Sequence, residues 1–323
     1  MPAVFSETQN ELVKVATDIS KDGLIRQRAA MNGVDFGDET SKSVFDGFRS
    51  LGISEANGGD GGSFVDLVVF TEALSRTIEP TQIFYHYAAL QLAQSLGIDV
   101  SEAIAGSERW SISFCGDSSV YVPFGNNSDR IVVVSDDDSA VRIIPGRTGK
   151  RRDAIDLSLK VTEIDLTETT SEPVASSKAD VQRSKLVLAA HLAGVARGAL
   201  SSATSYAAQR QQFGQFIGSF QGVAHPLSDA FVELESAWSL ILYAAWALDE
   251  ESSDALIASH LAIAKSGAMA IEVCERALQI FGGIGVTWEA DAHLYIRRVL
   301  TVNALIGGHS GQYRQAGVCA VNQ

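Results

Sequence analysis

The stretch Ala207–Asp229, AAQRQQFGQFIGSFQGVAHPLSD, lies between two long apolar, alanine-rich segments that we predict to be helices. The helical pattern breaks at Phe213-Gly214, with Arg210 just before the break and Gln221 opening the next helix. An arginine at a helix end, followed by a glycine turn, can hold its planar guanidinium in place for a phosphate or pyrophosphate. On residue types alone, a solvated arginine at an ordinary helix–helix turn is the simpler interpretation.

Further stretches of the sequence favour the phosphate-binding interpretation of Arg210. Gln279–Gly285, QIFGGIG, ends a later predicted helix and is followed by Tyr295–Arg298, YIRR. Near the N-terminus, Leu51-Gly52-Ile53 leads into Asn57–Gly62, NGGDGG, and then into a helix that contains Glu72. The order R-x-x-F-G, F-Q helix start, Q-I-F-G-G-x-G resembles the acyl-CoA dehydrogenase family. The resemblance covers both helical ends of the chain and is weak in the middle.

Composition excludes several classes of partner. The 323 residues are 46% hydrophobic and 20% charged, which is ordinary for a globular protein, and the net charge is −14 at pH 7. Such a charge argues against nucleic acid and against an anionic membrane surface. Cys115, Cys274 and Cys319 are far apart, so they form no metal-ligand spacing and indicate a reducing compartment.

No uninterrupted apolar run reaches membrane-spanning length, and Leu240–Leu248, among the longest, is interrupted by Tyr243. The N-terminal residues, MPAVFSETQNELVK, are polar and do not read as a signal peptide. We therefore expect a soluble cytoplasmic protein.

The pattern along the chain predicts an α+β fold that is mainly α, in three parts. Residues 1–106 form an N-terminal helical domain, residues 107–177 a reduced middle β-domain with its linker, and residues 178–323 a C-terminal helical bundle. Ser6 and Gln9 resemble a capping box at the first helix. The main predicted elements are helices at Phe64–Leu74, Ile83–Leu96, Leu186–Leu200, Leu227–Leu248, Asp254–Phe281, Leu294–Leu305 and Ser310–Val318, and strands at Trp110–Phe114, Arg130–Val134, Ser139–Ile144 and Asp156–Ile164.

Three details of this pattern are specific enough to check. Asp136-Asp137-Asp138 is placed as a polar hairpin turn between two strands. Leu186–Leu200 is rich in Ala and Gly, which lets helices approach closely, so a tightly packed bundle is expected. His86 lies among aromatic residues and is interpreted as a core or interface histidine rather than a catalytic one.

The resemblance implies an FAD cofactor bound across a subunit interface. It assigns the pyrophosphate and adenosine end of FAD to Arg210, Gln212, Phe213 and Gln221, and the second half of the same cradle to Gln279, Gly282 and Gly283. Glycines allow close backbone approach, and Gln279 offers both a donor and an acceptor. The alternative for Phe281–Gly285 is an ordinary helix C-cap with a glycine turn.

The catalytic base is where the sequence departs from the family. The commonest family pattern places a carboxylate where this chain has Gly307, and a second pattern places it where this chain has Ser184. Neither residue can take the α-proton of a thioester, so no catalytic residue is predicted here. Asp180 and His309 are the remaining candidates for a relocated base.

The middle domain departs as well. The family's T-E-x-x-x-G-S-D-type loop and W-I-T-type strand, which hold the flavin ring, are not found between Trp110 and Ser176. Cys115–Ser119 is at best a remnant of that loop. The resemblance thus keeps residues for the nucleotide end of FAD and loses those for its ring and for proton abstraction.

These losses resemble the short, base-lacking subunits of heterotetrameric α2β2 acyl-CoA dehydrogenases of actinobacterial steroid degradation. That resemblance implies a longer homologous partner chain, a steroid-type CoA thioester as substrate and, by family usage, electron-transfer flavoprotein as acceptor. Two alternatives stay open: a non-catalytic homologue that acts as a binding or scaffold protein, and a self-sufficient enzyme with a relocated base.

Overall fold

The computed structural model describes residues 5–32, 45–114, 118–147, 149–167, 169 and 171–321. The N-terminal part is helical: α1 (Glu7–Ser20), α2 (Gly23–Met31), η1 (Glu55–Asn57), α4 (Phe64–Ser75), α5 (Ile83–Ser95) and α6 (Ser101–Ala105). The predicted capping box is confirmed, because Ser6 Oγ accepts from the Gln9 backbone and Gln9 bonds back to Ser6 N. Almost every residue of α4 and α5 is buried, as expected from their apolar sequence.

The middle part consists of β1 (Trp110–Phe114), β2 (Ser119–Pro123), η2 (Gly125–Asn127), β3 (Arg130–Val134), β4 (Ala140–Pro145), β5 (Lys150–Arg152), β6 (Val161–Asp165) and β7 (Val174–Ala175). One sheet has the order β1-β3-β4-β7 and another has the order β2-β6-β5. β1 and β3 are parallel, and β3 and β4 form the antiparallel hairpin that the three aspartates predicted as a turn.

The predicted strand Asp156–Ile164 is wrong in its first half. β6 begins only at Val161, because Asp156 turns inward and its Oδ1 accepts from Ser158 N at 3.0 Å and Ser158 Oγ at 2.7 Å. Its other oxygen, Oδ2, accepts from the buried Arg298 side chain. An aspartate that bonds the backbone two residues on favours a turn over a strand.

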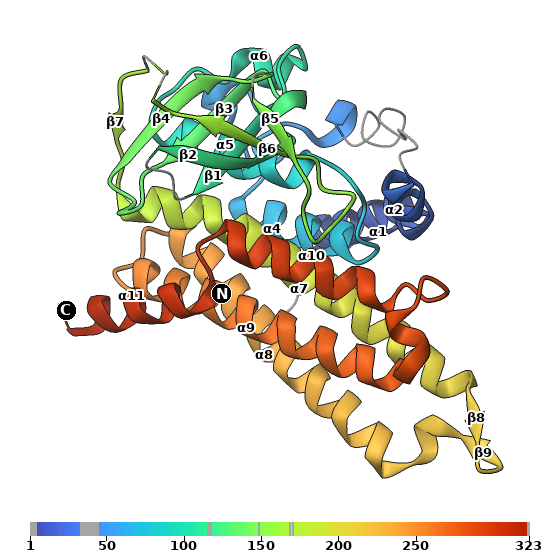
Figure 1. Ribbon diagram of the computed structural model, residues 1–323. Helices are drawn as coiled ribbons and strands as arrows, with labels where there is room; N and C mark the ends of the chain where they lie inside the picture. Colours follow the sequence, from blue (N-terminus) through green and yellow to red (C-terminus); the bar gives the residue numbers. More distant parts are fainter. Residues whose placement is uncertain are drawn as a thin grey trace.

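The C-terminal part contains α7 (Lys178–Gln209), β8 (Gln211–Gln212), β9 (Gln215–Phe216), η3 (Ile217–Ser219), α8 (Gln221–Asp249), α9 (Ala255–Phe281), η4 (Gly282–Val286), α10 (Ala292–Leu305) and α11 (His309–Val321). In Figure 1 the β-strands lie over one end of α7, and the β8–β9 hairpin projects from the opposite end of the bundle. The fold class, mainly helical α+β, is as predicted.

Small residues on α7 allow its close packing against α4. A Cβ added at Gly194 would lie 2.1 Å from the Glu72 carbonyl oxygen, and one at Gly198 would lie 1.8 Å from the Arg76 carbonyl oxygen. Both distances are far below a van der Waals contact. The glycine- and alanine-rich character of this helix is therefore a packing requirement, as the sequence indicated.

The structure corrects the expectation that no apolar segment is long enough to span a membrane. Of the described helices, α7, α8 and α9 are each long and apolar enough to cross a membrane by length and composition, although no uninterrupted apolar run is that long. Most of the apolar window of α7 and α9 is buried inside the fold, whereas less than half of that of α8 is. The apolar surface of α7 and α9 is thus used by helix packing, and α8 leaves Phe231 and Val232 exposed.

Candidate cofactor-binding site

The β8–β9 hairpin follows directly from the end of α7. Arg210 adopts an extended backbone, and its carbonyl accepts from Ile217 N at 2.8 Å, which closes the hairpin. Phe213 and Gly214 form the tip, with φ values of 54° and 81°. A two-residue tip with positive φ suits a hairpin, but a phenylalanine in that conformation is unusual. Phe213 is also 92% exposed, so the hairpin tip presents an apolar ring to its surroundings on a backbone conformation that is unusual for this residue type.

The polar residues of this segment are available for a ligand. Arg210, Gln212 and Gln221 are exposed, and the Arg210 guanidinium has no hydrogen bond or ion pair with any other described residue. α8 begins at Gln221 without a side-chain cap from the described residues. The free N–H groups and positive dipole end of such a helix favour an anion.

The second predicted half lies at the end of α9. Gln279 is exposed one turn before Gly282, whose N–H donates to the Gln279 carbonyl. Gly282 has φ 63° and ψ −145°, a conformation that only glycine adopts readily. A Cβ at Gly282 or at Gly283 would meet no described atom within 4 Å, so the backbone here is open to a ligand.

The two halves are neighbours at one end of the bundle. The rings of Tyr206, in the last turn of α7, and Phe281, at the end of α9, are stacked with centroids 4.5 Å apart. The hairpin projects from this same end in Figure 1. The structure thus brings the segments of all seven predicted cofactor residues to a single, solvent-exposed surface.

These residues fit the nucleotide end of FAD. A guanidinium and a helix start that have no side-chain partner among the described residues, together with open glycine backbone, are the groups that a pyrophosphate with an attached adenosine needs. The same surface lies far along α7 from Ser184, because the helix rises about 1.5 Å per residue between Ser184 and Arg210. The remnant proposed for the flavin-ring loop cannot be described, since residues 115–117 lie outside the described ranges.

The two positions of the family base hold no carboxylate and differ in environment. Ser184 is fully buried, and its hydroxyl donates to the Ala88 carbonyl at 2.6 Å, which engages its only proton. Gly307 is exposed in the α10–α11 turn with φ 86°. Neither arrangement offers a proton acceptor.

The alternative bases already have other contacts. One oxygen of Asp180 accepts from Ser177 N at 3.2 Å and Ser177 Oγ at 2.6 Å, which caps the start of α7. His309 begins α11, and its Nδ1 lies 3.4 Å from Asn303 Nδ2 on α10. His86 is a core residue as predicted: it accepts from Trp110 N at 3.1 Å, and burial together with nearby arginines lowers its pKa to about 3.

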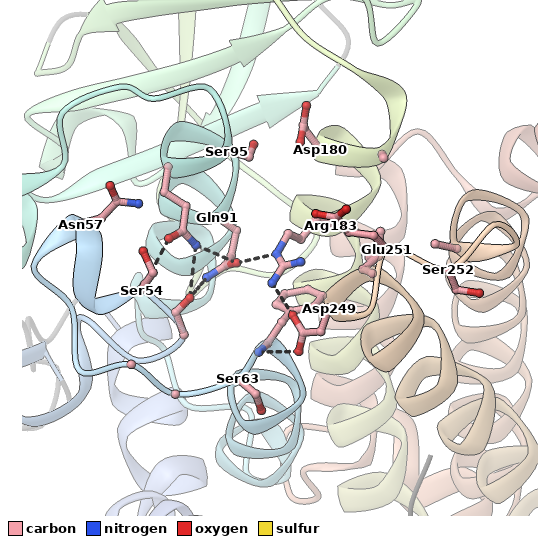
Figure 2. Close-up of a pocket in the computed structure, with 18 of the residues that line it drawn as sticks. Ser54, Asn57, Ser63, Gln91, Ser95, Asp180, Arg183, Asp249, Glu251 and Ser252 are labelled. Atoms are coloured by element: carbon pink, nitrogen blue, oxygen red, sulfur yellow. Dashed lines mark hydrogen bonds and ion pairs between the residues drawn. The ribbon is translucent and has the colours of Figure 1, made fainter.

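A cavity of about 850 Å³ lies where the glycine-rich Asn57–Gly62 stretch meets α5, the start of α7 and the α8–α9 turn (Figure 2). Arg183 projects into it and already has two partners: its Nε donates to Gln91 at 3.0 Å and its Nη2 to Asp249 at 2.6 Å. Its guanidinium also stacks over Phe64, 4.2 Å from the ring centroid. Arg183 was not predicted from the sequence, because its partners come from distant segments and no local motif indicates them.

Comparison with known proteins identifies relatives of this chain. Residues 174–315 match the family described as acyl-CoA dehydrogenase, C-terminal domain. Acyl-CoA dehydrogenase FadE34 of Mycobacterium tuberculosis is 31% identical over an alignment of 324 positions, gaps included, that covers 88% of this chain. This chain spans only 44% of the length of FadE34. Acyl-CoA dehydrogenase IpdE2 of Mycolicibacterium smegmatis is 28% identical over 83% of each chain.

Solved structures share the whole fold. A chain of the ChsE4–ChsE5 complex from Mycobacterium tuberculosis superposes with a TM-score of 0.83 over 100% of both chains, at 19% identity. A chain of the Tcur3481–Tcur3483 steroid ACAD, in its G363A variant, gives a TM-score of 0.82 over 98% of both chains, at 21% identity. These structures show the fold, and the matched C-terminal domain together with the sequence relatives shows that the chain belongs to the acyl-CoA dehydrogenase family.

Proposed function

We propose that this chain is the base-lacking subunit of a heteromeric, FAD-dependent acyl-CoA dehydrogenase. The enzyme introduces an α,β double bond into a CoA thioester of a steroid side chain or ring fragment. A longer homologous chain supplies the flavin-ring contacts and the catalytic base, and this chain supplies the nucleotide-end cradle. We place the complex, α2β2, in the cytoplasm, with electron-transfer flavoprotein as its acceptor.

One observation carries the proposal. The seven predicted FAD residues are exposed at one end of the bundle, and one of them, Arg210, has no partner among the described residues, while the positions of the family base hold Ser184 and Gly307. A cradle that opens outward suits a cofactor held mainly by another chain. A buried serine and an exposed glycine suit a subunit that does not abstract the proton itself.

The relatives support a divided enzyme. The segment of FadE34 that resembles this chain makes up 44% of that polypeptide. The rest of FadE34 is therefore longer than the matched segment. ChsE4–ChsE5 is a complex, and Tcur3481–Tcur3483 is a steroid ACAD named for two components. These names support a companion chain and a steroid-type thioester for this protein.

The chemistry assigned to this chain is binding and orientation. When bound, FAD accepts the hydride that leaves the β-carbon of the thioester. Arg210 would pair with the pyrophosphate through charge-assisted hydrogen bonds, with Gln212 and Gln221 beside it. Gln279 would bond the adenosine side, and Gly282 and Gly283 would let the backbone approach the cofactor. The Phe213 ring would cover the nucleotide from water.

Flavin content of the assembled complex tests this proposal. Co-purified with a companion of the same family, this chain should yield yellow protein that oxidises a CoA thioester. Because charge-assisted hydrogen bonds contribute roughly 1.5–3 kcal/mol, Arg210→Ala should weaken flavin retention by about 10- to 100-fold. Gln279→Ala should weaken it less. Arg314→Ala, at an exposed position of α11, is the matched control and should retain flavin.

Two results would count against the proposal. A complex that binds no flavin would favour the non-catalytic scaffold, and full dehydrogenase activity of this chain alone would favour a relocated base. Asp180→Asn and His309→Gln would identify that base. The capping role of Asp180 does not favour it.

A further inference from the structure

The seam between the β-domain and the bundle contains a buried ion pair that belongs to no predicted site. Lys185, one residue after Ser184 on α7, donates to both carboxylate oxygens of Asp138 at 2.8 Å. The side chains are only 5% and 16% exposed. Gln182 Nε2 lies 3.4 Å from the same carboxylate, and the Lys185 ammonium sits 5.4 Å above the Phe114 ring.

Asp138 reaches this place because the β3–β4 turn is built to present it. It has φ 59°, a left-handed conformation that aspartate tolerates better than most residues. The neighbouring Asp137 fixes the turn by accepting from the hydroxyls of Ser135 and Ser139, each at 2.7 Å. Ser176, just before α7, donates to the Asp138 carbonyl at 3.1 Å.

The groups on α7 form an anion site in their own right. A buried ammonium requires an anion, because an unpaired charge in this environment is strongly destabilising. Gln182 is fully buried, and its amide Nε2 faces the Asp138 carboxylate, so Gln182 and Lys185 both direct hydrogen-bond donors at the same anion.

We propose that Lys185 and Gln182 form a carboxylate-binding site that the chain fills with its own Asp138, so that the β3–β4 turn acts as a latch on α7. The latch closes the seam beside Ser184 and holds the sheet β1-β3-β4-β7 against the start of the bundle. Removing the Asp138 carboxylate should open the site to a small carboxylate from solution, for which formate is the probe.

Thermal unfolding of the full chain, in complex with its companion where it has one, tests the latch. Breaking the buried pair in Asp138→Ala should lower Tm by about 5 °C or more. Sodium formate, exchanged for sodium chloride at constant ionic strength, should restore at least about half of that loss and should saturate. Asp18→Ala, an exposed acid on α1, is the matched control and should show neither effect.

A double variant keeps the test decisive. Asp138→Ala with Lys185→Met removes both charges, so it should unfold at a higher temperature than Asp138→Ala and show no response to formate. The latch is refuted if Asp138→Ala unfolds within about 1 °C of Asp18→Ala, or if formate stabilises the single and double variants equally. Should Asp138→Ala fail to fold, a folded double variant supports the proposal and an unfolded one overturns it.

Discussion

At the scale of single residues, Arg298 joins several distant segments. From α10 it pairs with Asp156 of the β5–β6 connection and donates to the Ile78 and Glu79 carbonyls between α4 and α5. Its remaining donors reach Gln27 Oε1 on α2 and Ser158 Oγ, each at 3.1 Å. Burial alone would raise the pKa of Asp156, but the Arg298 charge, the hydrogen bond from Arg298 and the bonds that Asp156 accepts from the Ser158 hydroxyl and amide keep it lowered.

A second buried residue, His86, makes stability depend on pH. Burial first, and the Arg109 and Arg49 charges next, lower its folded pKa from 6.5 to about 3. Folding therefore excludes the proton, so the contribution of neutral His86 is complete above pH 6.5 and is lost as pH falls from 6.5 towards 3. The slope is about 1.4 kcal/mol per pH unit within that window.

The His86→Gln variant isolates this effect. Glutamine can still accept from Trp110 N but does not titrate, so the variant should lose less stability than the wild type between pH 6.5 and 4. Urea unfolding at a series of pH values measures the difference. Parallel curves for the two proteins would show that protonation of His86 does not contribute.

At the scale of elements, α7 packs against α4, α5, α8, α9 and α10. Its contact with α4 depends on glycines, which have no side chain to keep the two helices apart. Gly198→Ala would place a Cβ 1.8 Å from the Arg76 carbonyl oxygen, so the helices must separate. The expected cost is about 1–3 kcal/mol, despite the higher helix propensity of alanine. Gly317→Ala on α11, where the Cβ meets no described atom within 4 Å, should be neutral or slightly stabilising. Urea midpoints compare the two, and equal values would refute the packing argument.

The elements that the sequence predicted are those with a local cause. Repeating apolar positions located α4, α5 and the bundle helices, alternation located β1 and β4, and β-branched residues located β3. β2, β5, β7 and the short α2 and α6 were missed. β5 is three exposed basic residues and β7 is two residues long, so pairing with β6 and β4 defines them rather than their own sequence.

The site residues also divide into those with a local signal in the sequence and those defined by contacts between distant segments. Arg210, Phe213 and Gly282 stand at a helix end or a turn, where residue type and position are visible in the sequence. Arg183 and the Lys185–Asp138 pair depend on contacts between segments far apart in the chain. No local pattern carries that information, so only the folded arrangement shows them.

At the scale of the whole molecule, several apolar side chains gather on surfaces that this chain leaves uncovered. Phe213, Val286 and Trp288 are exposed in the hairpin or in and just after η4, and Phe231 and Val232 are exposed on α8. Such surfaces are typical of chains that function in an assembly. The exposed end of the bundle therefore has two expected neighbours, the FAD nucleotide and the companion chain that holds it.

Phe213→Gly separates folding of this chain from assembly. Glycine accepts φ 54° without strain, which offsets its greater freedom in the unfolded state, and the lost ring buries little area within this chain. The Tm of the isolated chain should thus change by no more than about 2 °C. In the complex, loss of the ring should weaken flavin retention by about tenfold, because the nucleotide and the companion lose a large apolar contact. Flavin absorbance after gel filtration, read beside Tm, measures both quantities. A variant that keeps its flavin would show that Phe213 has no part in the cradle, whereas a large fall in Tm would show that the hairpin tip stabilises this chain itself.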